Sequence, residues 1–159
     1  MLPLMNTRAL GVVAAVVFVS VTGIALAQDK EAVLKDRQAT MKEQGKDMQS
    51  IKAFLDGKGD LAQAKEGAVN LTKTTNKIPA LFPPGTEGPN PAGDYVAKPV
   101  IWSDWDKFIA VQKTAATKAD ALVVAVNSGD KAAIEAAYGD LGKNGCGNCH
   151  TTFREKIEK

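Results

Sequence analysis

The chain has 159 residues, of which 24% are charged, and a formal net charge of +2 at pH 7; this size suits one domain. The basic residues form no stripe with interleaved aromatic residues, which argues against nucleic acid as a partner. Two cysteines are too few for the disulfide framework of a small secreted protein, so they must serve another chemical purpose.

The first 27 residues have the pattern of an export signal. Arg8 is their only charge, an apolar stretch covers residues 9–27, and Ala25-Leu26-Ala27 matches a signal peptidase site. We therefore expect a signal peptide over residues 1–27, cleavage before Gln28, and a soluble mature domain over residues 28–159 that does not span the membrane. The length of the apolar stretch leaves an uncleaved membrane anchor as the alternative.

Helical periodicity predicts two helices in the first half of the mature chain. The first runs from about Lys30 to Asp56, and Gly57-Lys58-Gly59 ends it. Asp60 is placed to cap the second, from about Leu61 to Lys77. The apolar stripe of the first helix consists of Leu34, Met41, Met48, Ile51 and Leu55. The inner face of the second consists of Leu61, Ala64, Ala68, Leu71 and Thr75.

A long connection over residues 78–99 follows and contains six of the seven prolines, so we expect no helix there. A loop of this length usually has a role. We expect it to cover one side of a bound group, with Leu81 and Phe82 as its apolar anchors. No segment of the chain shows a convincing strand pattern.

Two further helices complete the prediction. Pro99 suits the first turn of a third helix that runs to about Asn127, and after Ser128-Gly129 the cap Asp130 begins a fourth, from about Lys131 to Ile157. The face of the third helix consists of Ile101, Trp105, Phe108, Ala115, Ala119, Leu122 and Val126. That of the fourth consists of Ile134, Tyr138, Leu141, Cys149, Phe153 and Ile157. The predicted fold class is all-α, an antiparallel up-down-up-down four-helix bundle.

The strongest local motif is Cys146-Gly147-Asn148-Cys149-His150. Cys-x-x-Cys-His is the attachment site of c-type haem. Thiols three residues apart share one helix face and can reach the two vinyl groups of one porphyrin, and the histidine on that face reaches the iron. The motif therefore predicts one covalently bound haem c, held by Cys146 and Cys149, with His150 as an axial ligand.

Three alternative roles compete with haem attachment at this motif. A structural zinc site needs about four ligands, and the chain offers two cysteines and one histidine. A thiol–disulfide redox pair belongs to a βαβ context, which the sequence pattern does not show. The third alternative is a pair of buried thiols without a role. Nearby, Gly139, Gly142, Gly145 and Gly147 indicate either a porphyrin lying against the backbone or a break in the helix.

His150 is the only histidine, which leaves methionine, lysine, a small molecule or nothing for the sixth iron position. It also leaves no distal histidine for acid–base catalysis, so we expect no enzyme. Counting 1.5 Å per helical residue from the bundle end places Met41 nearer the level of His150 than Met48. Packing in the core is the alternative role for Met41. Arg37, one turn before Met41, is a candidate for a haem propionate contact, with an exposed, solvated side chain as the alternative.

The chain resembles the class II cytochromes c, the cytochrome c′ family. The matching segments are the haem motif with Thr151-Thr152-Phe153-Arg154, Arg37-x-x-x-Met41-Lys42, Ile78-Pro79-Ala80-Leu81-Phe82-Pro83, and Lys98-Pro99-Val100-Ile101-Trp102. The resemblance implies a left-handed bundle, often dimeric, in the periplasm. It implies thioethers at the two cysteines and Arg154 beside the exposed imidazole of His150.

This family divides by what occupies the Met41 position. Low-spin members place a methionine there as the sixth ligand and carry electrons. High-spin members leave the iron five-coordinate and bind nitric oxide or carbon monoxide. Met41 fits the first group, so we predict a periplasmic single-electron carrier serving redox partner proteins, with the gas-binding protein as the alternative and a haem enzyme as the weakest hypothesis.

Overall fold

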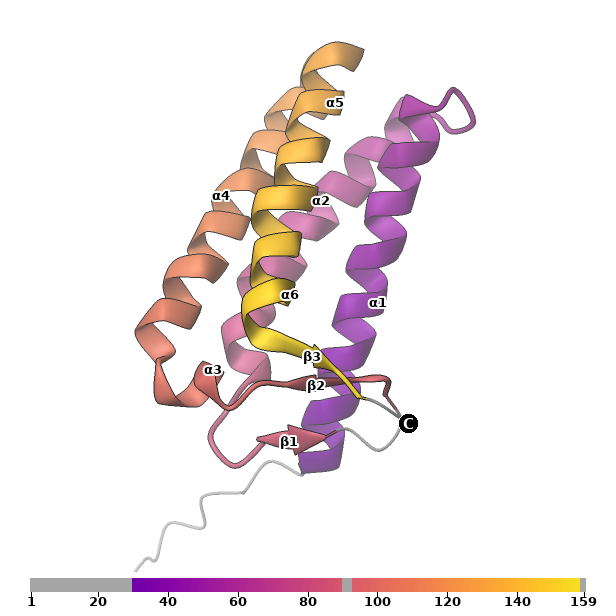
Figure 1. Ribbon diagram of the computed structural model, residues 1–159. Coiled ribbons are helices and arrows are strands. Elements are labelled where there is room, and N and C mark those ends of the chain that lie inside the picture. Colours follow the sequence, from indigo (N-terminus) through magenta and orange to yellow (C-terminus); the bar gives the residue numbers. More distant parts are fainter. Residues whose placement is uncertain (1–29, 90–92, 158–159) are drawn as a thin grey trace, which may run out of the picture.

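The structure is a computed structural model that describes residues 30–89 and 93–157. It is a four-helix bundle built from α1 (Lys30–Leu55), α2 (Leu61–Lys77), α4 (Trp105–Ser128) and one continuous helical column. That column consists of α5 (Lys131–Asp140), the π-helical segment η2 (Leu141–Gly147) and α6 (Asn148–Phe153). Neighbouring helices in the chain run antiparallel, so the predicted up-down-up-down bundle is confirmed (Figure 1). The expected signal peptide and its cleavage before Gln28 lie outside the described residues.

The predicted helix ends agree with local backbone chemistry. The Asp60 side chain accepts a hydrogen bond from the Gln63 N–H, and the Asp130 side chain accepts one from the Ala132 N–H, which caps α2 and α5. Gly57 and Gly129 adopt φ values of 72° and 74°, a left-handed conformation that glycine reaches at little cost. No helix in the described part of the chain combines the length and hydropathy that a membrane crossing requires.

The third helix is broken, which corrects the expectation of one helix from Pro99 to Asn127. A single turn, α3 (Val100–Ser103), precedes a break at Asp104 with φ −135° and ψ 62°. The Asp104 side chain then accepts a hydrogen bond from the Lys107 N–H and caps α4. The break changes the helical phase, so Trp105, expected on the buried face, is 37% exposed.

The fourth helix ends four residues earlier than expected, at Phe153, and Ile157 is not helical. The next residues form β3 (Arg154–Lys156), which pairs antiparallel with β2 (Tyr95–Ala97), and β2 pairs with β1 (Gly88–Pro89). The expectation of no strands is therefore wrong. Segments of two or three residues carry too little alternation to be recognised, and pairing with β2 satisfies backbone groups that the end of α6 would otherwise leave open. The sheet lies at the end of the bundle where α6 ends (Figure 1).

Buried apolar side chains form two clusters. The closed cluster, away from the sheet, consists of Ile51, Ala64, Ala68, Leu71, Ala119, Leu122, Ala125, Val126, Ile134 and Leu141. The pocket cluster, near the sheet, consists of Ile78, Leu81, Phe82, Ile101, Phe108 and Phe153. Leu81 and Phe82 are 3% and 6% exposed, as expected for the anchors of the long connection. That connection begins with one turn of 3-10 helix, η1 (Ile78–Leu81), which corrects the expectation of no helix over residues 78–99.

Two of the four glycines near the haem motif are tightly packed against the protein itself. The helical column continues through them instead of breaking. A Cβ on Gly145 would lie 3.4 Å from the Ala115 Cα of α4, and one on Gly147 would lie 3.1 Å from the Gly142 carbonyl oxygen. Protein atoms therefore already account for the missing side chains at these two positions.

Candidate functional site

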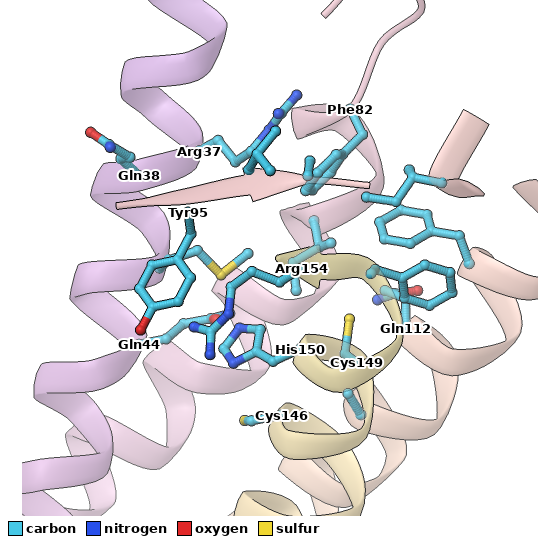
Figure 2. Close-up of a pocket in the computed structure, with 18 of the residues that line it drawn as sticks. Arg37, Gln38, Gln44, Phe82, Tyr95, Gln112, Cys146, Cys149, His150 and Arg154 are labelled. Atoms are coloured by element: carbon cyan, nitrogen blue, oxygen red, sulfur yellow. The ribbon is translucent and has the colours of Figure 1, made fainter. Parts of the chain in front are cut away.

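A cavity of about 470 Å³ opens in the half of the bundle that carries the sheet, within the range typical of small-molecule and cofactor sites. Its walls come from α1, α2, α4, α6, the long connection and β2. Cys146, Cys149 and His150 line it from one side, and Arg37 lines it from α1 (Figure 2). Met41, also on α1, lines the cavity as well. The structure thus brings together every side chain that the sequence suggested for the site.

The two cysteines are free thiols. Burial raises the pKa of Cys146, and burial together with the nearby Cys146 raises the pKa of Cys149 to about 11, against a smaller lowering by Arg154. Both sulfurs are therefore protonated at neutral pH, unlike the low-pKa thiolate of a thiol–disulfide redox site. This argues against a redox pair at the motif.

Burial lowers the pKa of His150, and the positive charge of Arg154 lowers it further. The imidazole is therefore neutral at pH 7, which is the form that binds a metal. Arg154 follows the last residue of α6, and its guanidinium lies 4.2 Å from the centre of the Tyr95 ring. Figure 2 shows this guanidinium on the side of the cavity where the imidazole lies.

Arg37 is buried, with 9% of its surface exposed. The alternative prediction, that Arg37 is an exposed, solvated side chain, is therefore wrong. Its Nε donates to the Leu81 carbonyl at 3.0 Å and its Nη2 donates to the Thr86 hydroxyl at 2.8 Å. The guanidinium also lies 4.0 Å from the centre of the Phe82 ring. Burial lowers the pKa of Arg37 to about 10, against a raising effect of Glu87, so the side chain still carries its charge at pH 7. Arg37 therefore fastens the long connection and places a cation at the cavity wall.

The two methionines of α1 have different surroundings. Met41 lines the cavity and packs against the pocket cluster. Met48 packs against the closed cluster, and its terminal methyl lies 3.6 Å from where a Cβ on Gly142 would stand. The sequence placed Met41 nearer than Met48 to the level of His150 along the bundle. The structure agrees, because Met41 lines the cavity and Met48 packs in the closed cluster.

The sequence reasoning missed a polar group inside the cavity. Gln112 is 5% exposed, and its Nε2 donates to the Thr75 carbonyl at 2.9 Å. Gln44 Nε2 donates to the Thr75 hydroxyl at 3.3 Å, and all three residues line the cavity. The sequence did contain an indication of this group. Gln112 lies on the predicted buried face of the third helix, four residues after Phe108 and three before Ala115. A polar residue at a buried helix position marks a site that is not filled by packing alone.

The residues fit a large, flat, mostly apolar group that carries its own metal. Within residues 30–89 and 93–157 no three His, Cys, Asp or Glu side chains are grouped as a metal site would require, which argues against structural zinc. Two thiols and a neutral imidazole instead face a cavity walled by aromatic side chains, with a cation at its edge. This donor set and shape suit a haem bound covalently through Cys146 and Cys149.

A Cys-x-x-Cys-His motif that faces an internal cavity is the arrangement expected of a c-type cytochrome. The family described as Cytochrome C′ matches residues 32–154. The chain belongs to the cytochrome c′ family, as the resemblance predicted, and membership implies a covalently bound haem c.

Individual relatives carry two names used within this family. A cytochrome c′ of Pararhodospirillum photometricum is 36% identical over 126 residues, 79% of this chain and 98% of the relative. A cytochrome c-556 of Agrobacterium tumefaciens is 32% identical over 125 residues, 77% of this chain and 97% of the relative. The nitric oxide complex of a cytochrome c prime variant from Alcaligenes xylosoxidans superposes with a TM-score of 0.71 at 31% identity, covering 82% of this chain and 98% of the other.

Proposed function

We propose that the protein is a periplasmic single-electron carrier with one haem c, whose iron is bound axially by His150 and Met41. The observation that carries the proposal is that Met41 lines the same cavity as Cys146, Cys149 and His150. Thioether ligation opposite a histidine raises the reduction potential of a haem. A bundle that holds both ligands in place changes little between the two redox states.

The motif residues have distinct roles in this proposal. Cys146 and Cys149 would hold the haem through two thioethers, one to each vinyl group of the porphyrin. Burial raises the pKa of both thiols, so both sulfurs carry their protons at neutral pH. His150, held neutral by burial and by Arg154, offers its ring nitrogen to the iron. Arg154 then lies beside the imidazole and is held there by its contact with Tyr95.

Arg37 suits a haem propionate. Burial lowers the pKa of Arg37 more than Glu87 raises it, so the guanidinium would gain from a further anionic partner. Nε and Nη2 already donate to the long connection. The remaining nitrogen, Nη1, is the one that we assign to a propionate oxygen. A charge-assisted hydrogen bond of this kind compensates the burial of the guanidinium.

The cellular setting follows from the same proposal. Residues 1–27 direct export, cleavage falls before Gln28, and the mature form exchanges electrons with periplasmic redox proteins, as a monomer or a homodimer. The chain contains one histidine, which the iron uses, so no second histidine remains for acid–base catalysis. We therefore assign no enzymatic reaction.

A gas-binding cytochrome c′ with a five-coordinate iron is the second candidate. It is favoured by the similar chain whose structure is a nitric oxide complex. In this case Met41 would fill the distal side of the cavity without binding the iron. The two candidates differ in spin state and in their response to carbon monoxide.

The visible spectrum of the reduced holoprotein separates the candidates. An electron carrier with Met41 as ligand gives a low-spin spectrum that carbon monoxide does not change. Met41→Leu should become high-spin and bind carbon monoxide, because leucine offers no donor atom. Met48→Leu is the matched control, with the same substitution two helical turns away in contact with the closed cluster, and should leave the spectrum unchanged. A wild-type protein that is high-spin and binds carbon monoxide supports the gas-binding function instead.

A further inference from the structure

The helical column that carries the haem motif changes its geometry just before the motif. Between α5 and α6, residues Leu141–Gly147 form a π-helix. The Asn148 N–H donates both to the Lys143 carbonyl, five residues back, and to the Gly145 carbonyl, three residues back. Such turns are rare and are frequent at functional sites. Cys146 lies within this segment, and Cys149 and His150 follow in α6.

The burial pattern shows what the π-helical turn does to the helix face. Leu141 is 1% exposed in the closed cluster, and Phe153 is 3% exposed in the pocket cluster. Leu141 and Phe153 are separated by 12 positions. In a regular α-helix each residue turns by about 100°, so the two side chains would point about 120° apart around the helix axis. If one residue is absorbed in the wider turn, the remaining eleven steps leave about 20° between them. Both side chains can then face the bundle interior.

The local sequence allows this widening. Three of the seven residues of η2 are glycine. A Cβ on Gly145 would lie 2.9 Å from the Leu141 Cδ1 and 3.5 Å from the Ala115 Cβ of α4. Glycine therefore lets the widened column keep close contact with α4. The packing of the column against α4 therefore accommodates the π-helical turn.

We propose that η2 is a positioning element that sets the rotation of the haem motif, in the haem-bound protein proposed above. It absorbs one residue, so that the apolar face of α5 and the haem-binding face of α6 both meet the interior of the bundle. A regular α-helix through the same residues would turn Cys146, Cys149 and His150 by about 100° relative to Leu141. That rotation would carry the motif away from the cavity.

Deletion of one residue from η2 tests the proposal. Lys143 is exposed, so its side chain contributes little packing, and Lys143→Ala is the matched control that keeps the residue count. A deletion removes the residue that the wider turn absorbs, so a regular α-helix through the shortened segment keeps the motif facing the cavity. We therefore expect the deletion variant to keep its attached haem by mass and to bind added imidazole as wild type and Lys143→Ala do. Insertion of one alanine after Lys143 should instead turn the motif away from the cavity, displace the haem and tighten imidazole binding at least tenfold. A deletion variant that binds imidazole as tightly as the insertion variant overturns the proposal.

A crystal structure of the wild-type holoprotein gives a second, independent decision, whether or not the deletion variant folds. The Asn148 N–H should still bond to the Lys143 carbonyl. A regular α-helical bond from Asn148 to the Asn144 carbonyl in the holoprotein would overturn the proposal. Wild-type protein that carries no covalent haem contradicts the proposed function itself, whereas haem-bearing wild type with a deletion variant that binds imidazole as the insertion variant does contradicts only the role of η2.

Discussion

The same helices pack differently in the two halves of the bundle. In the closed cluster, alanines let the helices approach one another, and Ala64, Ala68 and Ala119 are each 0% exposed beside Leu71 and Leu122. In the half that carries the sheet, aromatic side chains surround a cavity of about 470 Å³ instead of filling it. Three buried polar side chains on the same helices line that cavity, and they are Arg37, Thr75 and Gln112.

This difference separates the tasks of stabilising the fold and holding a cofactor. The closed cluster gains its stability from dense apolar packing, which needs no ligand. The walls around the cavity are instead tied by hydrogen bonds, from Arg37 to the long connection and from Gln112 to α2. A haem would complete the core of that half. Substitutions in the two halves should therefore have different consequences.

The largest expected loss of stability comes from the closed cluster. Leu122 is 0% exposed, so Leu122→Ala leaves a cavity and should lower the free energy of unfolding by about 2–5 kcal/mol. The haem spectrum of the folded variant should stay as in wild type. Val124→Ala, on the same helix at a side chain that is 71% exposed, is the control and should change stability by less than about 0.5 kcal/mol. Denaturant unfolding followed by circular dichroism measures both. A changed spectrum in folded Leu122→Ala would show that the two halves are not separable.

A smaller effect with a different character is expected at the cavity wall. Arg37→Leu removes the donors to the Leu81 carbonyl and the Thr86 hydroxyl and should cost about 1–3 kcal/mol. The loss should appear first as faster proteolysis within residues 82–99, because these contacts fasten that connection. Arg37→Lys should be intermediate, since an ammonium keeps the charge but lacks the planar fork. Lys46→Leu, at an exposed position of the same helix, serves as control. Equal cleavage rates in Arg37→Leu and wild type would contradict the role given to Arg37.

Much of the fold was predictable because its signals are local. Helix periodicity and the caps Asp60 and Asp130 depend on neighbouring residues, and the structure confirms the bounds of α2 at Leu61 and Lys77. The break at Asp104 and the sheet were missed for a physical reason. Asp104 is a good cap inside an apolar pattern, and strand β3 exists because β2, nearly 60 residues earlier, supplies its partner. Pairing over such a distance leaves little trace in a short segment.

The candidate site likewise contains residues that the sequence predicts and residues that it does not. Cys146, Cys149 and His150 were recognised because covalent haem attachment fixes their spacing. Gln112 and Tyr95 were missed, since an amide in a helix and a tyrosine in a proline-rich segment are common away from any binding site. The π-helical turn was missed as well, although its glycines were noticed. Whether Met41 and Arg37 touch the haem stays a prediction, to be decided by the spectra of their variants.

The smallest expected effect concerns charge on the outer surface between α1 and α2. Burial raises the pKa of Asp47, and Glu43 and Glu66 raise it further, against the lowering effect of the hydrogen bond from Asn70. The folded state therefore binds more protons than the unfolded state between the ordinary value of 3.8 and the raised pKa, so wild type should lose stability as the pH rises through that window. Asp47→Asn should lose less over the same window, and Asp120→Asn, at an exposed position of α4, should follow wild type. Denaturant unfolding from about pH 3 to pH 7 measures this difference. Parallel curves for wild type and Asp47→Asn would mean that the Asn70 hydrogen bond balances burial and repulsion at this site.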